Sequence, residues 1–214
     1  MFEQIGLGTI LKRYRLVVPP NQRDYSWTEQ HVKTLFYDFA RSISDNEENY
    51  FVGTVVGVEK KANQLEIVDG QQRLSTTVIF LCELKNYLNE ISESGLADSV
   101  KKDFLVEFDR SKKEEVVKME LNVADNEYFK SMIYADSQPP KKPVKPSHDL
   151  IADTFRLSKE QVKSIVAAFN KKDQADQLNK WIDFIEHKAV VMLVTVSDKT
   201  NAYKMFETLN DRGL

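Results

Sequence analysis

The sequence predicts an α+β protein, in which strands and helices share one core. Three runs rich in β-branched residues, at 50–58, 64–68 and 189–196, are typical of buried strands. Two segments, 27–44 and 71–91, repeat apolar residues at three- and four-residue steps, as amphipathic helices do. With 42% hydrophobic residues among 214, the chain can bury a sizeable core. We therefore expect a mixed sheet packed against helices.

At the amino-terminal end we expect a strand, a fixed turn and a helix. Residues 9–18 are rich in β-formers with partial alternation, and the two prolines at 19–20 end the strand. Ser26 and Glu29 form a capping-box pattern, in which the first residue caps a helix and the second reaches back to it. The predicted helix continues to about residue 44.

The next part of the chain is expected to form a hairpin followed by a long helix. The polar residues 60–63 would form the turn between the two central strands. A helix with one buried stripe would begin directly after Asp69 and Gly70, and residues 92–95 would end it. Cys82 lies in an apolar run of this helix, so we expect a buried structural thiol rather than a nucleophile.

From residue 96 onward the sequence is mainly helical in character. A short strand is expected at 116–121 and a helix at 126–135. The proline-rich residues 137–148 then form a loop, whose lysines either bind phosphate or belong to a solvated linker. Ser158 begins a second capping-box pattern that would open a helix, and another helix is expected around 178–185.

The chain should close with a strand and a helix. Residues 189–196 are a continuous apolar run, and Asp198 can cap a last helix with a four-residue apolar face: Ala202, Met205, Phe206 and Leu209. The elements suggest three parts. These are an αβ core at 1–95, a mainly helical section at 96–189, and a strand and helix at 190–214 that return to the core.

Composition excludes several classes of site. The 30 Lys and Arg against 33 Asp and Glu give a net charge of −3, which argues against a wholly basic nucleic-acid-coating protein. The seven glycines match neither G-x-G-x-x-G nor a P-loop. One cysteine can form neither an internal disulfide nor a cysteine-based zinc site, and the three histidines lack metal-ligand spacing. No apolar run approaches the about 18 residues of a membrane span, so we expect a soluble, cytoplasmic protein without a signal peptide.

Three polar clusters follow apolar elements, where a scaffold commonly presents functional groups. They comprise residues 21–25, 69–73 and 210–213. Each cluster contains an arginine close to an amide side chain, and this combination suits a polyanion.

The second cluster is suited to a phosphate group. Gly70 permits a tight turn, and the first turn of the following helix leaves backbone N–H groups unpaired. Arg73 adds a planar cation, and Gln71 or Gln72 can donate to phosphate oxygens or orient an attacking water. Asp69 could hold Mg²⁺. In the alternative interpretation, Asp69 only caps the helix, and the three residues from Gln71 to Arg73 are solvated.

The first cluster is followed by two aromatic residues. Tyr25 and Trp27 could stack a base, although a tryptophan at a helix start also commonly packs against the core. Arg23 and Arg212 could close a phosphate site from other elements, or could pair with neighbouring aspartates.

Three motifs together resemble the amino-terminal domain of GmrSD-type modification-dependent restriction proteins and related phage-defence proteins. The motifs are Pro-Asn-Gln-Arg-Asp-Tyr-Ser-Trp at 20–27, Ile-Val-Asp-Gly-Gln-Gln-Arg-Leu-Ser-Thr-Thr at 67–77 and Phe-Glu-Thr-Leu-Asn-Asp-Arg-Gly-Leu at 206–214. They occur in the family's order. The resemblance spans residues 10–214, although 96–189 match only in general character.

This resemblance implies a small ParB/sulfiredoxin-like mixed sheet with helices. It also implies hydrolysis of GTP or another nucleoside triphosphate with Mg²⁺ or another divalent cation. The family's nucleotide-associated motif maps onto residues 69–73. Its other two motifs place Gln22 and Arg23, and likewise Asn210 and Arg212, at the nucleotide.

In proteins of this kind the nucleotide domain controls a nuclease that restricts modified DNA. The nuclease resembles a His-Asn-His domain, carboxy-terminal or on a partner chain, and we expect it to lie outside this chain, which ends within the third motif. We therefore hypothesise a nucleotide-binding and hydrolysing regulatory domain. Two rival hypotheses are a non-catalytic module that senses modified DNA, and an assembly domain whose motifs only stabilise turns.

Overall fold

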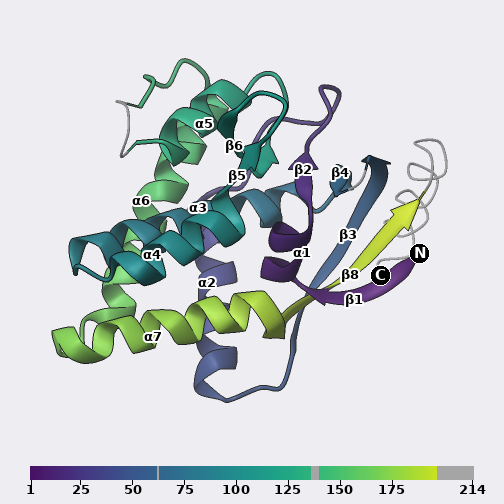
Figure 1. The fold of residues 1–214 in the computed structure, drawn as a ribbon. Coiled ribbons are helices and arrows are strands. Elements are labelled where there is room, and N and C mark those ends of the chain that lie inside the picture. The colour runs from purple at the N-terminus through teal and green to yellow at the C-terminus, as the bar shows by residue number, and fades with distance from the viewer. Residues whose placement is uncertain (62, 136–139, 197–214) are drawn as a thin grey trace.

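A computed structural model describes residues 1–61, 63–135 and 140–196 of the chain (Figure 1). Its main feature is a six-stranded mixed sheet. The strand order is β1 (Phe2–Gly6), β8 (Ala189–Val196), β3 (Tyr50–Lys61), β4 (Gln64–Asp69), β2 (Arg15–Val17) and β7 (Met119–Glu120).

The pairing of these strands combines local and distant segments. β3 pairs antiparallel with β4 and parallel with β8, while β1 closes one edge antiparallel to β8. At the other edge β2 lies parallel between β4 and β7. The predicted α+β class is confirmed. The predicted strands at 50–58, 64–68 and 189–196 are also confirmed, although β3 continues to Lys61.

Helices supply most of the remaining structure. They are α1 (Leu7–Arg13), α2 (Glu29–Ser44), α3 (Gln71–Glu90), α4 (Ser94–Val100), α5 (Asn126–Ile133), α6 (Pro146–Val166) and α7 (Lys171–Asp183), with π-helical turns η1 (Lys101–Leu105) and η2 (Phe184–Lys188). A two-stranded sheet joins β5 (Val106–Asp109) to β6 (Glu114–Val117). None of the described helices is both long enough and apolar enough to cross a membrane.

The core surrounds α3, and the first residues of this helix form part of the site described below. The long helices α3, α6 and α7 lie to one side of strands β3 and β8 (Figure 1). One hydrophobic cluster includes side chains from the first and second predicted parts, among them Phe80 and Phe129, and from β8. α3 is buried over most of its surface rather than along one stripe. Thr76, Thr77 and Ile79, which are not on a single face of the helix, are all buried. Cys82 is buried, as predicted. The division at residues 95 and 189 stays a prediction.

The strand predicted at 9–18 is wrong over its first half, where α1 forms instead. Leu7, Ile10 and Leu11 recur at helical spacing and are fully buried. The β-forming side chains are overridden by tertiary packing, because Gly6 and Gly8 let the chain approach η2 closely. A Cβ at Gly6 would lie 1.9 Å from the Glu186 carbonyl oxygen.

The capping residue predicted for the second element is also wrong. α2 starts at Glu29 with Thr28 as its cap, and His31 rather than Glu29 completes the capping box. The Thr28 backbone N–H donates to His31 Nδ1 at 3.2 Å. Ser26 lies two residues before this cap, and its backbone N–H donates to the Gln72 side chain.

Three further predictions need correction in the helical section. α6 begins at Pro146, so Ser158 lies fully buried inside a helix and opens none, and the loop predicted to 148 ends earlier. The strand predicted at 116–121 is divided between β6 and β7 at Lys118. The helices expected near 126–135 and 178–185 are confirmed as α5 and α7, and the last helix, predicted from Asp198, lies outside the described residues.

Lys118, which lies between these strands, uses its ammonium group inside the protein. Its Nζ donates to the backbone carbonyls of Leu11 and Lys12, each at 3.1 Å, and of Asp103 at 2.7 Å. The residue is only 7% exposed, and burial lowers the pKa of its amino group. One side chain thereby connects the end of α1 to η1.

We expect Lys118→Met to lower the free energy of unfolding by about 2–4 kcal/mol, because three buried carbonyls lose a charged donor. Urea denaturation measures this loss. The control is Lys142→Met at an exposed lysine. Equal stability of the two variants would contradict the role of Lys118.

Candidate functional site

The first two polar clusters, which are separated by more than forty residues, line one cavity. Its volume is about 530 Å³. The lining residues are Gln22, Arg23, Trp27, Val68, Asp69, Gly70, Gln71, Gln72 and Arg73. Pairing of β4 with β3 places the start of α3 at this cavity, and the loop of residues 22–27, here called the site loop, forms the opposite wall.

Gly70 shapes the start of α3. Its φ of +92° is left-handed, and a Cβ there would lie 2.8 Å from Val55 Cγ2, so the position requires glycine. Gly70 itself is the N-cap, and no side chain caps the helix. The alternative in which Asp69 caps α3 is therefore wrong. The first turn of this twenty-residue helix offers backbone N–H groups and the positive end of a helix dipole.

Arg73 is fixed against strand β3. One of its Nη atoms donates to the Thr54 carbonyl at 2.8 Å, and the side chain is half-buried. The guanidinium lies over Gly53, whose φ is +129° and where a Cβ would come within 2.7 Å of the nitrogen. Gly53 thus makes room for Arg73, and the other N–H groups of this arginine have no partner in the described part of the chain.

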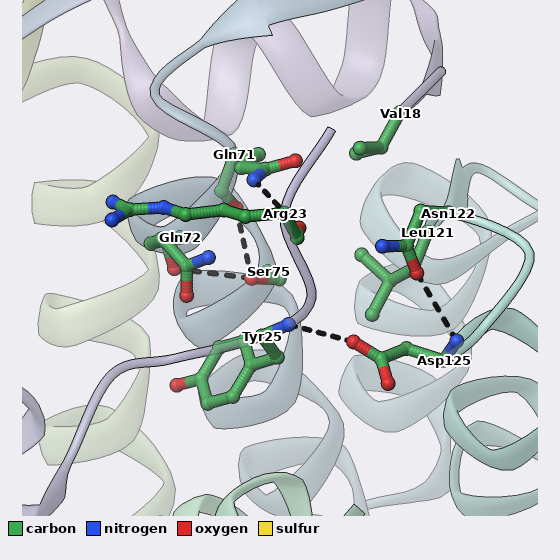
Figure 2. Close-up of a pocket in the computed structure, with 9 residues that line it drawn as sticks. All are labelled: Val18, Arg23, Tyr25, Gln71, Gln72, Ser75, Leu121, Asn122 and Asp125. Atoms are coloured by element: carbon green, nitrogen blue, oxygen red, sulfur yellow. Dashed lines mark hydrogen bonds between the residues drawn. The ribbon is translucent and has the colours of Figure 1, made fainter. Parts of the chain in front are cut away.

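Arg23 is the second cation of the cavity and is exposed. Its guanidinium has no hydrogen-bond or carboxylate partner among the described residues. In Figure 2 the side chain extends past Gln72 and away from Asp125. Its backbone, in contrast, is held: the Arg23 carbonyl accepts a hydrogen bond from Gln71 Nε2 at 3.1 Å.

Gln71 and Gln72 are buried and bind the site loop. Gln72 Oε1 accepts from the backbone N–H groups of Ser26 at 3.0 Å and Trp27 at 3.3 Å. Gln72 Nε2 donates to the Asp24 carbonyl at 3.2 Å. The interpretation of both glutamines as solvated first-turn residues is therefore wrong. Orientation of a water by either one stays a prediction.

Gln22 connects the site loop to the sheet. Its Nε2 donates to the Val68 carbonyl at 3.1 Å, near the end of β4. This bond and those of Gln71 and Gln72 hold the loop over the start of α3. The amides predicted to bind phosphate are thus largely committed to the protein backbone.

The two aromatic residues differ in position. Tyr25 is only 4% exposed, and its hydroxyl is hydrogen-bonded to Thr76 Oγ1 at 2.7 Å and Thr154 Oγ1 at 3.0 Å. Burial raises the pKa of this phenol. The structure therefore argues against base stacking by Tyr25, because its ring faces the core. Trp27 is half-buried and lines the cavity, so a base can reach it, although it also packs on the core and stacks near His31.

A second, much smaller cavity lies behind the site loop (Figure 2). Its volume of about 10 Å³ suits a single water and excludes a nucleotide. Asn122 and Asp125 line it, and neither was among the predicted site residues. They follow a strand, as the first two predicted clusters do, and the same criterion would have found them.

Asp69 is the single carboxylate among the residues that line the larger cavity. No group of three or more His, Cys, Asp or Glu in the described ranges could hold a metal ion. Mg²⁺ commonly binds through one or two carboxylates and the phosphates of its nucleotide, so Asp69 fits such an ion as one ligand of several. Asn210 and Arg212 lie outside the described residues.

We expect Gln72→Ala to loosen the site loop, because three backbone groups lose their partner at once. Stability should fall by about 1–3 kcal/mol, and the amides of Ser26 and Trp27 should exchange faster in a hydrogen-exchange experiment. Gln30→Ala, at an exposed glutamine of α2, is the control. Unchanged exchange at both amides would show that Gln72 does not hold the loop.

Comparison with known proteins assigns this chain to a family. The family model described as the GmrSD restriction endonuclease, N-terminal domain, matches residues 7–214. No curated protein matches the chain. The match covers almost the whole sequence, including both clusters of the cavity and the third cluster at 210–213. The chain belongs to the family of GmrSD restriction endonuclease N-terminal domains.

Proposed function

We propose that this domain binds and hydrolyses a nucleoside triphosphate, GTP or another, in the 530 Å³ cavity and thereby regulates DNA restriction. Family membership implies involvement in modification-dependent restriction and phage defence. The observation that carries the nucleotide proposal is convergence. Arg23 of the site loop meets Arg73 and the start of α3, which no side chain caps, at one cavity, although these two segments are far apart in the sequence.

The charges of the cavity favour an anion. The lining contains two guanidinium groups and a single carboxylate, that of Asp69. The N-terminal end of α3 adds the positive end of a helix dipole. Each arginine retains N–H groups that can form paired hydrogen bonds to phosphate oxygens. A triphosphate with a divalent cation would suit this lining, because Asp69 would hold the cation and the arginines the phosphate oxygens.

The other predicted residues take supporting roles in this proposal. Trp27 stacks the base, while Gln22, Gln71 and Gln72 hold the site loop in place. Asn210 and Arg212 are proposed to complete the phosphate contacts. The partner is a nuclease domain, in the same protein or on another chain, that cuts DNA. A cytoplasmic location stays a prediction.

Phosphate release from each nucleoside triphosphate, measured with Mg²⁺, tests the proposal. Arg73→Ala and Arg23→Ala should each lower kcat/KM about 10²-fold, since each removes a cation from the developing negative charge. Chelation of the metal with EDTA should abolish release. Arg156→Ala, at an exposed arginine of α6, should leave the rate unchanged.

Two results would refute nucleotide chemistry in this cavity. One is a protein that binds no nucleotide at millimolar concentration. The other is an Arg73→Ala variant that hydrolyses as fast as the wild type.

A second candidate is a non-catalytic sensor of modified DNA. The observation in its favour is that Trp27 and the unpaired Arg23 lie together at the cavity, where an unstacked base could bind. This alternative predicts an affinity for DNA that falls steeply as the salt concentration rises and that does not change when nucleotides are added. Titration of a modified and an unmodified duplex at two salt concentrations distinguishes the two candidates.

A further inference from the structure

Side chains from two directions bind the backbone of the site loop. Gln71 and Gln72 of α3 bind it on one side, as described above. On the other side Asn122 Nδ2 donates to the Gln22 carbonyl at 3.0 Å and to Asp24 Oδ1 at 2.8 Å. Figure 2 shows the loop passing between these two sets of side chains. The second set comes from a part of the chain outside the three polar clusters.

Asp125 makes the most buried of these contacts. Its side chain is 1% exposed, and Oδ2 accepts from the Tyr25 backbone N–H at 2.6 Å. Oδ1 accepts from Ser147 Oγ, in the first turn of α6, at 2.5 Å. A buried carboxylate is costly unless it is hydrogen-bonded, and the N-terminal end of the 21-residue α6 adds a favourable dipole.

Tyr25 is held by α6 at both ends. Its backbone binds Asp125, which binds Ser147, and its hydroxyl binds Thr154 of the same helix. Thr154 donates its own hydroxyl proton to the Leu150 carbonyl at 2.8 Å, so Tyr25 is the donor to Thr154 and the acceptor from Thr76. Positions 147 and 154 are two turns apart on one face of the helix.

His148 strengthens the same junction. Its Nε2 must carry the proton, because it lies 3.0 Å from the Ala124 carbonyl, and its Nδ1 accepts from the Val144 N–H. The imidazole ring stacks on the ring of Tyr128, with 4.4 Å between the two ring centroids. The turn that carries Asp125 is thus fixed to the start of α6 at several points.

We propose that Asp125 is a positioning residue for Arg23. Arg23 stands two residues before Tyr25, and its guanidinium has no partner among the described residues, while its own carbonyl is bound by Gln71 and the N–H of Tyr25 by Asp125. The carboxylate therefore determines where the loop presents the guanidinium, and α6 supports it through Ser147. The contact of the guanidinium with phosphate rests on the proposed function. The hydrogen bonds that fix the backbone of the loop are independent of that function.

Asp125→Ala and Asp125→Asn test this role together. The alanine variant loses the acceptor, whereas asparagine can still accept from Tyr25 through Oδ1 and donate to Ser147 Oγ through Nδ2. In Asp125→Ala we expect Tyr25 amide exchange, followed by NMR, to rise about 10- to 100-fold, as for the loss of a charged hydrogen bond. KM for the triphosphate should rise about tenfold or more, with a smaller change in kcat. Asp125→Asn should stay within about threefold of the wild type in both measurements.

Leu178→Ala is the matched control, because it opens a cavity in α7, at a fully buried position that lines neither cavity of the site. Both variants are compared at temperatures where circular dichroism shows equal folded fractions. Unchanged Tyr25 exchange in Asp125→Ala, or an equal rise of KM in Leu178→Ala, overturns the positioning role. A rise of Tyr25 exchange in Asp125→Ala but not in Leu178→Ala supports the positioning of the loop. If the wild type nevertheless hydrolyses no nucleotide, the proposed function fails while the positioning of the loop stands.

Discussion

The hydrogen bonds of the Gln72 side chain are the constraint on which the cavity depends. One amide binds two N–H groups and one carbonyl of the site loop, and it does so from the first turn of the central helix. Ser26 and Trp27 donate to Gln72 and lie outside the following helix, since α2 starts only at Glu29. The loop therefore stays extended over the start of α3, and the space between them is the cavity.

The sheet provides the rigid side of the same arrangement. β4 ends at Asp69, Gly70 turns the chain in a left-handed conformation, and α3 begins at once. The adjacent strand β3 contributes the Thr54 carbonyl that fixes Arg73, at a point where Gly53 leaves space for the guanidinium. A hairpin, two glycines and one helix start thus place a cation and a set of backbone N–H groups on the same wall.

The sequence predicts local features of this fold well, and contacts between distant segments poorly. The hairpin, the start of α3 after Gly70 and the buried β8 all follow from periodicity and turn residues. In residues 7–13 the β-forming residues conceal the helical spacing of the buried leucines and isoleucine, and the close packing against Glu186 is not visible in the sequence. Likewise, the polar character of Gln72 suggested solvent or ligand contact. Its partners are backbone groups some 46 residues away, and only the folded chain brings them together.

Pairing of charges explains how a chain with a net charge of −3 can present an anion site. Arg13, Arg15 and Arg156 each lie beside a carboxylate, and this pairing largely cancels their field. Arg23 and Arg73 have no carboxylate partner in the described part of the chain. Neutral amides of Gln22, Gln71 and Gln72 hold the walls around them, and the carboxylate that also binds the site loop, Asp125, lines the smaller cavity and not this one. The structural bonds at the larger cavity therefore leave its positive charge intact. The local potential of the cavity is therefore set by which arginines remain unpaired, and not by the overall composition.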